Sequence, residues 1–305
     1  MRAAVIFGLG SSEKDLKPFQ NQSETTWVIG LPASSSDADA ILIFGGDGTV
    51  HRHLAQLVKL RLPVLVVPCG SGNDFARALR LRSRKDSLVA WRKFESGNAT
   101  VRVIDLGVIT SSTLPAGEAP APHKHYFCCV GGVGLDGEVS RRANQLPRWL
   151  RGHGGYVVSL PAALFRFAPA SMKIRTSSEH HPETFVERSA KPTVLVAIAN
   201  TPVYGGGMKI APGAQMDDGQ LDICIVSDIN KFKLLCLFPI VYFGKHLRME
   251  EVEYLQAGRI KIETEKPLDV YADGEYVCQT PIEVSVAKGI LPVIVHSSHF
   301  LVSGF

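Results

Sequence analysis

Two short glycine-rich segments constrain this chain most, because each follows an apolar run and precedes a helical pattern. Residues 45–49 read GGDGT and directly follow the apolar run 40–44. Residues 70–73 read GSGN and come after the apolar run 64–67. Such runs are typical of parallel strands that are buried on both faces. Because parallel strands end at one edge of a sheet, we expect the first glycine loop (residues 45–49) and the second glycine loop (residues 70–73) to face one crevice.

The predicted secondary structure changes near residue 105. Before it, apolar runs alternate with helical patterns, which predicts a Rossmann-like α/β domain with a parallel sheet over residues 1–105. After it, strand-like segments dominate, which predicts a mainly antiparallel β-sandwich domain over residues 106–290. The strands expected last in the chain are 282–286 and 292–296. Helices are expected to interrupt the second domain at 137–151, 156–166 and 231–243.

The first glycine loop has the composition of an anion site. Backbone N–H groups at a strand-to-helix turn bind anions, and Gly45, Gly46 and Gly48 lack the Cβ atoms that would keep a phosphate at a distance. Asp47 has two open interpretations: contact with a phosphate-bound Mg²⁺, or acceptance of backbone N–H bonds that hold the loop. A plain glycine turn explains an isolated GGDG equally well. In the second glycine loop, Asn73 or the following Asp74 is expected to cap the next helix.

Charge and cysteine content narrow the function classes. The formal net charge is only +4, so we expect no nucleic-acid partner. The arginine clusters at 77–93 and 141–151 are interpreted first as solvated helix faces, with attraction to polyphosphate or an anionic membrane as the alternative. None of the six cysteines forms a CxxC pair, which indicates buried, reduced thiols in a cytoplasmic protein. The longest apolar stretch, 234–243, is too short to span a bilayer, so membrane contact, at the inner face, would be peripheral.

Further motifs follow in a fixed order along the chain. Together with the two glycine loops they resemble the diacylglycerol kinase catalytic-domain family, which includes bacterial lipid kinases and the sphingosine and ceramide kinases. The segments that carry the resemblance are GGDGT at 45–49, GSGNDFA at 70–76, GGVGLDGEV at 131–139, NTPVYGGGMKIAP at 200–212, DGQLD at 218–222 and DGE at 273–275.

This resemblance implies an activity and a set of site residues. The activity is transfer of the γ-phosphoryl group of ATP to a lipid hydroxyl at a membrane surface, with diacylglycerol or a related long-chain alcohol as acceptor. The nucleotide would lie between the two domains, and residues 291–305 would return to the first. Glu275 takes the catalytic position together with Asp47, and Asp218 with the carbonyls of Gln215 and Gln220 matches a Mg²⁺ site. The residues expected to contact ATP are Gly45, Gly46, Asp47, Gly48, Thr49, Val50, His51, Gly70, Ser71, Gly72 and Asn73.

Three departures from the family pattern stand in the first domain. Residues 7–12 read FGLGSS where the family often has an Asn-Pro…Gly segment. The run before Gly45 is short, which predicts a reduced helix–strand unit, and only Thr26 is a candidate for a nucleotide-contacting threonine there. His51 and Arg52 replace the usual Asn-Glu pair, and a helix-surface position explains His51 as well as a phosphate or adenine contact does.

Two alternatives to a lipid kinase stay open. NAD kinases share GGDGT and phosphorylate a soluble ribose hydroxyl, and a nucleotide- or lipid-binding regulator without catalysis would tolerate the departures. DGE at 273–275 is by itself consistent with a plain β-turn. The apolar and arginine-rich segment 141–167 suits either an interfacial element or an ordinary helix packed on the second domain. A homodimer is an option that the sequence does not decide.

Overall fold

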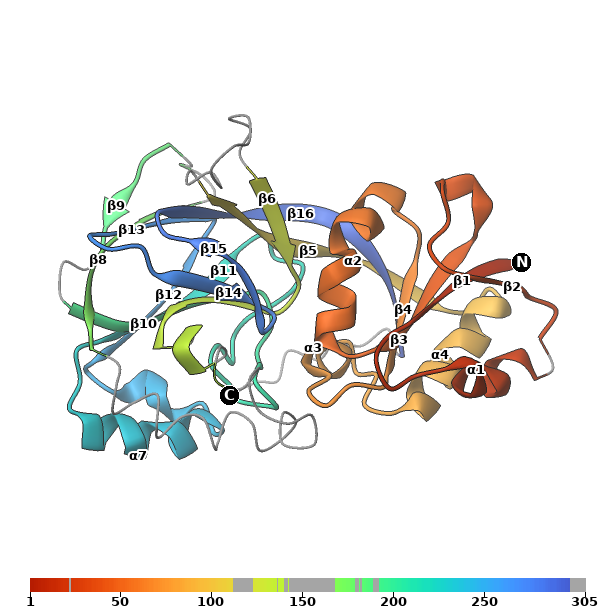
Figure 1. The fold of residues 1–305 in the computed structure, drawn as a ribbon, viewed down its shortest axis with the longest axis horizontal. Coiled ribbons are helices and arrows are strands. Elements are labelled where there is room, and N and C mark those ends of the chain that lie inside the picture. The colour runs from red at the N-terminus through yellow and green to blue at the C-terminus, as the bar shows by residue number, and fades with distance from the viewer. Residues whose placement is uncertain are drawn as a thin grey trace. The chain divides into compact units, whose positions relative to one another are not determined.

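The computed structural model describes residues 1–21, 23–111, 123–135, 137–139, 142, 168–178, 181, 183–188 and 192–296. The chain forms two compact units, shown in Figure 1: Met1–Ile104 with Gly289–Phe305, and Asp105–Lys288. It passes from one unit to the other twice, within the strands β5 (Thr100–Ser111) and β16 (Ile282–Val295).

The first unit is built on a parallel sheet. Its strands lie in the order β2 (Thr26–Ile29), β1 (Arg2–Phe7), β3 (Ala40–Gly45), β4 (Val64–Pro68) and the end of β16. All of these neighbours pair in parallel. Every residue of β3 is buried, as expected for a central strand that is covered on both faces. Phe44 is opposite Phe7 and Gly45 is opposite Pro68, so β1, β3 and β4 end together at one edge.

The helices of this unit follow its strands, as the apolar spacing predicts. They are α1 (Glu13–Gln20), a 3₁₀ turn η1 (Ser35–Asp37), α2 (Asp47–Leu60), α3 (Asp74–Ala78) and α4 (Arg84–Glu95). Leu54 and Leu57 lie on the buried face of α2, which ends at Arg61 in the left-handed conformation. Ser83 and Asp86 form a capping box at the start of α4. The helix–strand unit before β3 is present but short, as predicted: α1 has 8 residues and β2 has 4.

The described strands of the second unit form two antiparallel sheets, which are joined by a short pairing of β8 with β10. One has the order β9, β8, β13, β16, β5, β6, and the other β15, β14, β7, β10, β11, β12. Their bounds are β6 His123–Phe127, β7 Val130–Gly134, β8 Ala170–Ser177, β9 Val186–Glu187, β10 Pro192–Ala199, β11 Leu221–Ser227, β12 Val252–Ala257, β13 Arg259–Thr264, β14 Asp269–Ala272 and β15 Glu275–Gln279. Buried side chains of both sheets form one core, among them Ile174, Ile260, Val284, Val133, Val196 and Ile223. The predicted fold class, parallel α/β followed by antiparallel β, is confirmed.

Two details of the second unit differ from the sequence prediction. The strands expected at 282–286 and 292–296 form one long strand, β16, in which Gly289 at φ 55° takes up the backbone conformation that only glycine adopts easily. Cys236 is exposed and Cys69 is half-buried, so the expectation of buried thiols holds only for Cys128, Cys129, Cys224 and Cys278.

Helices cover part of the second unit. The helix expected at 231–243 is present as α7 (Lys231–Val241) and is followed by the 3₁₀ turn η2 (Lys245–Arg248). Residues 137–139 are helical, but most of the helices expected at 137–151 and 156–166 lie outside the described residues, as does most of segment 141–167. No helix in the described ranges combines the length and the apolarity needed to cross a bilayer.

Candidate functional site

The two glycine loops lie against each other at the edge where β3 and β4 end. The N–H of Cys69 donates to the carbonyl of Gly45 over 3.0 Å, which continues the strand pairing into the loops. A Cβ atom on Gly46 would lie 2.8 Å from the Cα of Gly70, a separation that real Cβ atoms do not show. Gly46 and Gly70 are therefore required by the packing of the two backbones, whatever ligand they also admit.

Asp47 connects the first glycine loop to the helix that follows the second. Its Oδ2 accepts the N–H of Asp74 and its Oδ1 accepts the N–H of Phe75, each over 3.0 Å. These two N–H groups are among the first of α3, which have no partner within the helix. Of the two interpretations open for Asp47, the structure shows the one in which it holds the loops; its catalytic assignment stays a prediction.

The second glycine loop is closed by its own asparagine. Asn73 has a left-handed backbone, its Oδ1 accepts the N–H of Gly70 over 2.9 Å, and its Nδ2 donates to the carbonyl of Gly70 over 2.6 Å. Its side chain makes no capping bond to α3, and Asp74 pairs with Arg77. Asn73 occupies the predicted N-cap position of α3, but the side-chain bond expected there comes instead from Asp47 in the first glycine loop. Ser71 is exposed at the tip of this loop.

The start of α2 has the form of an anion-binding end. The N–H groups of Thr49 and Val50 donate to the carbonyl of Gly46, over 2.9 and 3.2 Å, so these two are used within the first turn. The dipole of the helix still favours negative charge at this end. The Thr49 side chain is buried against Gly8 and Gly45, where a Cβ on either glycine would overlap it. Val50 is fully buried and faces the core.

The departures from the family pattern have defined positions. In the loop at residues 7–12, the Ser11 hydroxyl donates to the carbonyls of Gly8 over 2.9 Å and Phe44 over 2.6 Å, which ties that loop to the end of β3. His51 is half-buried on α2. Arg52 is exposed and donates to the carbonyl of Gly48, one turn earlier. Thr26 is opposite Arg2, the first residue of β1, and so lies at the amino end of the parallel sheet. The two glycine loops follow the carboxyl ends of β3 and β4, so the structure does not bring Thr26 together with them.

Part of the first arginine cluster is neutralised by acids. Arg77 pairs with Asp74, Arg84 with Asp15, and Arg92 with Glu95 at 2.9 Å. These pairs fit the solvated-face interpretation for the three arginines involved.

The composition of the glycine loops is compatible with a polyphosphate. Gly46 and Gly70 pack directly against each other, and a Cβ at Gly72 would lie 2.9 Å from the Asp47 carboxylate, so a side chain at any of the three would push the loops apart. Backbone of this kind beside a helix N-terminus is suited to phosphates, and the ATP contacts themselves stay a prediction.

In the second unit, Asp218 lies in a group of acids. Its Oδ1 accepts the N–H of Gln220 over 3.0 Å, and the carboxylate of Asp105 accepts the N–H of the intervening Gly219 over 2.8 Å. Burial raises the pKa of Asp218, and the negative charges of Asp105 and Asp217 raise it further. Carboxylate and carbonyl oxygens are the ligands that Mg²⁺ prefers, so the donor set has the right chemistry, and Mg²⁺ binding here stays a prediction. Gln215, the other predicted ligand, is exposed at the start of the same turn.

Two buried acids extend this group and were missed by sequence reasoning. Asp105 in β5 is 4% exposed, and Asp222 in β11 is 1% exposed. Asp222 accepts the hydroxyl of Tyr254, and Gln256 reaches both Asp218 and Asp222 at 3.4 Å. The signal that could have found them is an acid inside an apolar strand, which is rarely buried without partners.

Glu275 stands at the beginning of β15 and is exposed. It follows a two-residue hairpin turn in which Asp273 has φ 51° and Gly274 has φ 83°, values typical of a type I′ turn. The Asp273 carboxylate accepts the N–H groups of Cys128 over 2.9 Å and Cys129 over 2.7 Å. The turn is thus anchored to the β6–β7 connection and presents the Glu275 carboxylate to solvent.

Two protein-family models match this chain. Residues 19–109 match the diacylglycerol kinase catalytic domain, and residues 130–295 match the YegS C-terminal NAD kinase beta sandwich-like domain. The second match alone covers more than half of the chain. The two glycine loops lie in the first region, and Asp218 and Glu275 lie in the second.

Similar proteins are also named as lipid kinases. A diacylglycerol kinase of Mycobacterium tuberculosis (strain H37Rv) is 31% identical over 262 residues, which cover 86% of this chain and 78% of the relative. The putative lipid kinase YtlR of Bacillus subtilis is 28% identical over 83% of this chain and 79% of its own length. The chain therefore belongs to the diacylglycerol kinase-type lipid kinase family, a family of phosphotransferases, and the resemblance inferred from the motifs is confirmed.

Solved structures support the fold. A putative diacylglycerol kinase from Bacillus anthracis superposes with a TM-score of 0.67 at 21% identity, over 96% of this chain and 97% of that one. An NAD kinase from Archaeoglobus fulgidus in complex with ATP superposes with a TM-score of 0.51 at 14% identity, over 98% and 94%. At these identities the likeness concerns the fold alone. The assignments of single residues to ATP, Mg²⁺ and catalysis stay predictions.

Proposed function

We propose that this protein transfers the γ-phosphoryl group of ATP to the hydroxyl of a lipid, with diacylglycerol as the first acceptor. The observation that carries the proposal is the junction of the two glycine loops, where Asp47 of one loop caps the helix that follows the other. It brings two glycine backbones and the start of α2 together at the carboxyl edge of a parallel sheet, where α/β folds bind ligands, in a chain that belongs to a lipid kinase family.

Each loop has a defined part in nucleotide binding. The positive end of the α2 dipole would attract phosphate oxygens, and the glycines would let the backbone approach them closely. Asp47 keeps the two loops in register, so the site is formed before ATP arrives. Mg²⁺, when bound, supplies neutralisation of the charge that develops during phosphoryl transfer.

Glu275 is the proposed general base. A neutral alcohol is a poor nucleophile, and a positioned carboxylate that accepts its proton typically contributes about 10²- to 10⁴-fold in rate. The hairpin turn held by Asp273 gives Glu275 a fixed backbone position, while its exposed side chain can meet a substrate that comes from solution or from a membrane surface.

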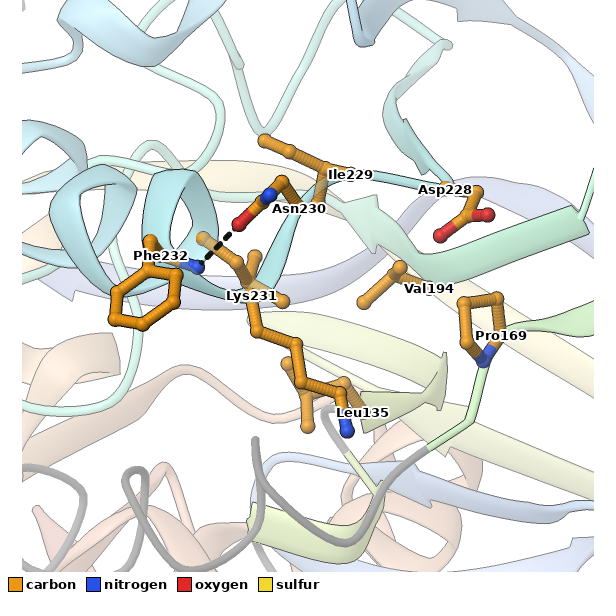
Figure 2. A pocket seen from close by; sticks show the side chains of 9 residues that line it. Leu135, Pro169, Val194, Asp228, Ile229, Asn230, Lys231 and Phe232 are labelled. Atoms are coloured by element: carbon orange, nitrogen blue, oxygen red, sulfur yellow. Dashed lines mark hydrogen bonds between the residues drawn. The ribbon is translucent and has the colours of Figure 1, made fainter.

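A partly apolar cavity in the second unit supports a lipid acceptor. Its volume is about 440 Å³. Figure 2 shows the lining residues around the start of α7. Phe232 is 78% exposed at its rim and offers an aromatic surface to an acyl chain. We propose that the cavity takes part of an acyl chain. Its apolar lining is Leu135, Pro169, Val194, Ile229, Phe232 and Leu234, and its polar lining is Asp228, Asn230 and Lys231.

The test is transfer of label from γ-labelled ATP to diacylglycerol in mixed micelles. Wild type should produce labelled phosphatidic acid, and Glu275→Gln should lower kcat by about 10²- to 10⁴-fold while ATP binding is kept. Glu265→Gln, at an exposed position on the same unit, is the matched control and should keep full activity. Full activity of Glu275→Gln would remove Glu275 from the mechanism.

The same assay separates the alternatives. Labelled NADP from NAD, without any labelled lipid, would replace the proposal with an NAD kinase. Nucleotide binding by calorimetry without transfer to any member of a broad lipid panel would indicate a regulator that has lost catalysis. A total lipid extract incubated with protein and ATP, then scanned for new phosphomonoesters, would identify the acceptor.

A further inference from the structure

The connection between β6 and β7 brings two neighbouring thiols to the same side of the chain. In an extended strand, consecutive side chains point to opposite faces. Cys128 and Cys129 lie instead in a bend, and their Sγ atoms are 3.9 Å apart. Both thiols are buried, at 0% and 3% exposure. The carboxylate of Asp273 completes the group, because one ligand atom from each of the three residues lies within 4.8 Å of the others.

The spacing of these atoms matches a tetrahedral metal site. With Zn–S bonds of about 2.3 Å and Zn–O bonds of about 2.0 Å, two sulfur ligands are about 3.8 Å apart and a sulfur and an oxygen about 3.5 Å. The Cys128 and Cys129 Sγ atoms are 3.9 Å apart, and the Cys128 Sγ is 3.4 Å from the Asp273 Oδ2. Two of the three ligand pairs therefore have the spacing of a tetrahedral site, and the third, between the Cys129 Sγ and the Asp273 carboxylate, is within 4.8 Å.

The bend is held on both sides before any ligand binds. Asp273 accepts the N–H groups of Cys128 and Cys129, and a longer bond of 3.3 Å from Val130. On the other side, fully buried Asn200 donates from Nδ2 to the carbonyl of Cys128 over 3.1 Å and from its backbone N–H to the carbonyl of Cys129 over 2.8 Å. Such outer contacts orient metal ligands and raise affinity.

We propose that Cys128, Cys129 and Asp273 form a binding site for a thiophilic divalent cation of the zinc class. On binding, each thiol releases its proton to solvent and the thiolates and the carboxylate bind the metal, which leaves one tetrahedral position for water. Asp273 is half-buried, so the entry path runs past its carboxylate. Because Asp273 begins the turn that leads to Glu275, the bound cation would also fix that turn.

Cadmium titration of the reduced full-length protein tests the proposal. Cd²⁺ reports thiolate ligation by its ultraviolet charge-transfer absorption, and the band should saturate at one Cd²⁺ per chain with two thiolates. Competition with a chromophoric chelator gives Kd for Cd²⁺ and for Zn²⁺. Cys129→Ser should weaken Kd by more than the roughly 10- to 100-fold that loss of an outer contact causes. Cys224→Ala and Cys236→Ala, at a buried and an exposed thiol elsewhere, should leave Kd unchanged.

A second readout covers the case in which a variant at the bend does not fold. In wild type, bound Zn²⁺ should protect Cys128 and Cys129, but not Cys236, from alkylation detected by mass spectrometry in mild denaturant. Saturation that persists in folded Cys129→Ser, equal protection of all cysteines, or an absent charge-transfer band in wild type would each overturn the proposal. None of these outcomes depends on kinase activity, so the metal site and the proposed function are tested separately.

Discussion

The Asp47 carboxylate accepts the backbone N–H of Phe75 over 3.0 Å, although the two residues belong to helices that follow different strands. The sequence separation of 28 residues is bridged by one side chain, which fixes the distance between two loops that would otherwise be independent. Four predictions follow from this and other relationships in the two units.

Removal of the Asp47 carboxylate should separate the loops. Asp47→Ala should lower the free energy of unfolding by about 1–2 kcal/mol, since α3 loses its capping acceptor. Asp47→Asn keeps one acceptor oxygen and should lose less, because only one of the two N–H bonds is kept in full. Urea unfolding measures the free energy of unfolding of both variants. Calorimetry measures their nucleotide affinity, which should fall less in Asp47→Asn than in Asp47→Ala. Equal stability of all three proteins would contradict the capping role.

Gly46→Ala should disrupt the junction more than an ordinary glycine substitution does. The new Cβ would lie 2.8 Å from the Gly70 Cα, a backbone atom that cannot rotate away, so overpacking should cost about 1–3 kcal/mol. Gly131→Ala is the matched control, because its Cβ would be in ordinary contact 3.6 Å from the Ile109 Cδ1. Thermal unfolding of both variants is the measurement, and equal losses would show that the two loop backbones separate easily.

Mg²⁺ should stabilise the protein through Asp218. Burial and the neighbouring acids raise the pKa of Asp218, so its ionised form is unfavourable in the fold without a cation. We expect Asp218→Asn to unfold at equal or higher temperature than wild type in chelator, and to lose the increase in Tm that wild type shows with Mg²⁺. Asp217→Asn, at the exposed neighbouring position, should keep that increase. A Mg²⁺-dependent Tm in Asp218→Asn equal to that of wild type would place the cation elsewhere.

Stability should fall on mild acidification because of His246. This side chain is fully buried, its Nε2 is 3.0 Å from the carbonyl of Ile210, and burial lowers its pKa. Below about pH 6.5 the unfolded chain takes up the proton and the folded chain does not, so the free energy of unfolding decreases as pH falls, by at most about 1.4 kcal/mol per pH unit. Above that pH both states are neutral and the contribution vanishes.

His246→Gln is the variant that checks this assignment. Urea unfolding at pH 7.5 and pH 5.5 should show a smaller difference in His246→Gln than in wild type. His181→Gln, at an exposed position, should show the wild-type difference. If His246→Gln keeps that difference too, another group causes the loss of stability.

Strong local patterns were sufficient to predict the frame of the molecule. The apolar run 40–44 became β3, and the spacing of Leu54 and Leu57 became the buried face of α2. Strand β2 was missed, because it is the edge strand of the sheet and three of its four residues are exposed. It therefore lacks the apolar run that marks a buried strand. The sequence predicted a break within β16, where Gly289 and Pro292 are residues typical of turns. In the structure the strand continues through both residues, and it pairs with β13 before them and with β4 after them.

Short glycine-rich motifs were sufficient to predict the loops of the candidate site, but not the hydrogen bonds between residues distant in sequence. The cap of α3 comes from Asp47, 27 residues before Asp74, and no local rule connects the two. The bend at Cys128 and Cys129 likewise depends on Asn200 and Asp273, which are distant in sequence. Side-chain to backbone bonds between segments of this kind follow from tertiary packing, which single-sequence periodicity does not contain.

The pairing of Val293 with Val64 makes the first unit discontinuous along the chain. During synthesis β4 lacks this parallel neighbour until residues 289–295 have left the ribosome. The half of the molecule that is translated first is therefore completed last, and until then β4 has an open edge that a chaperone or a neighbouring nascent chain could occupy.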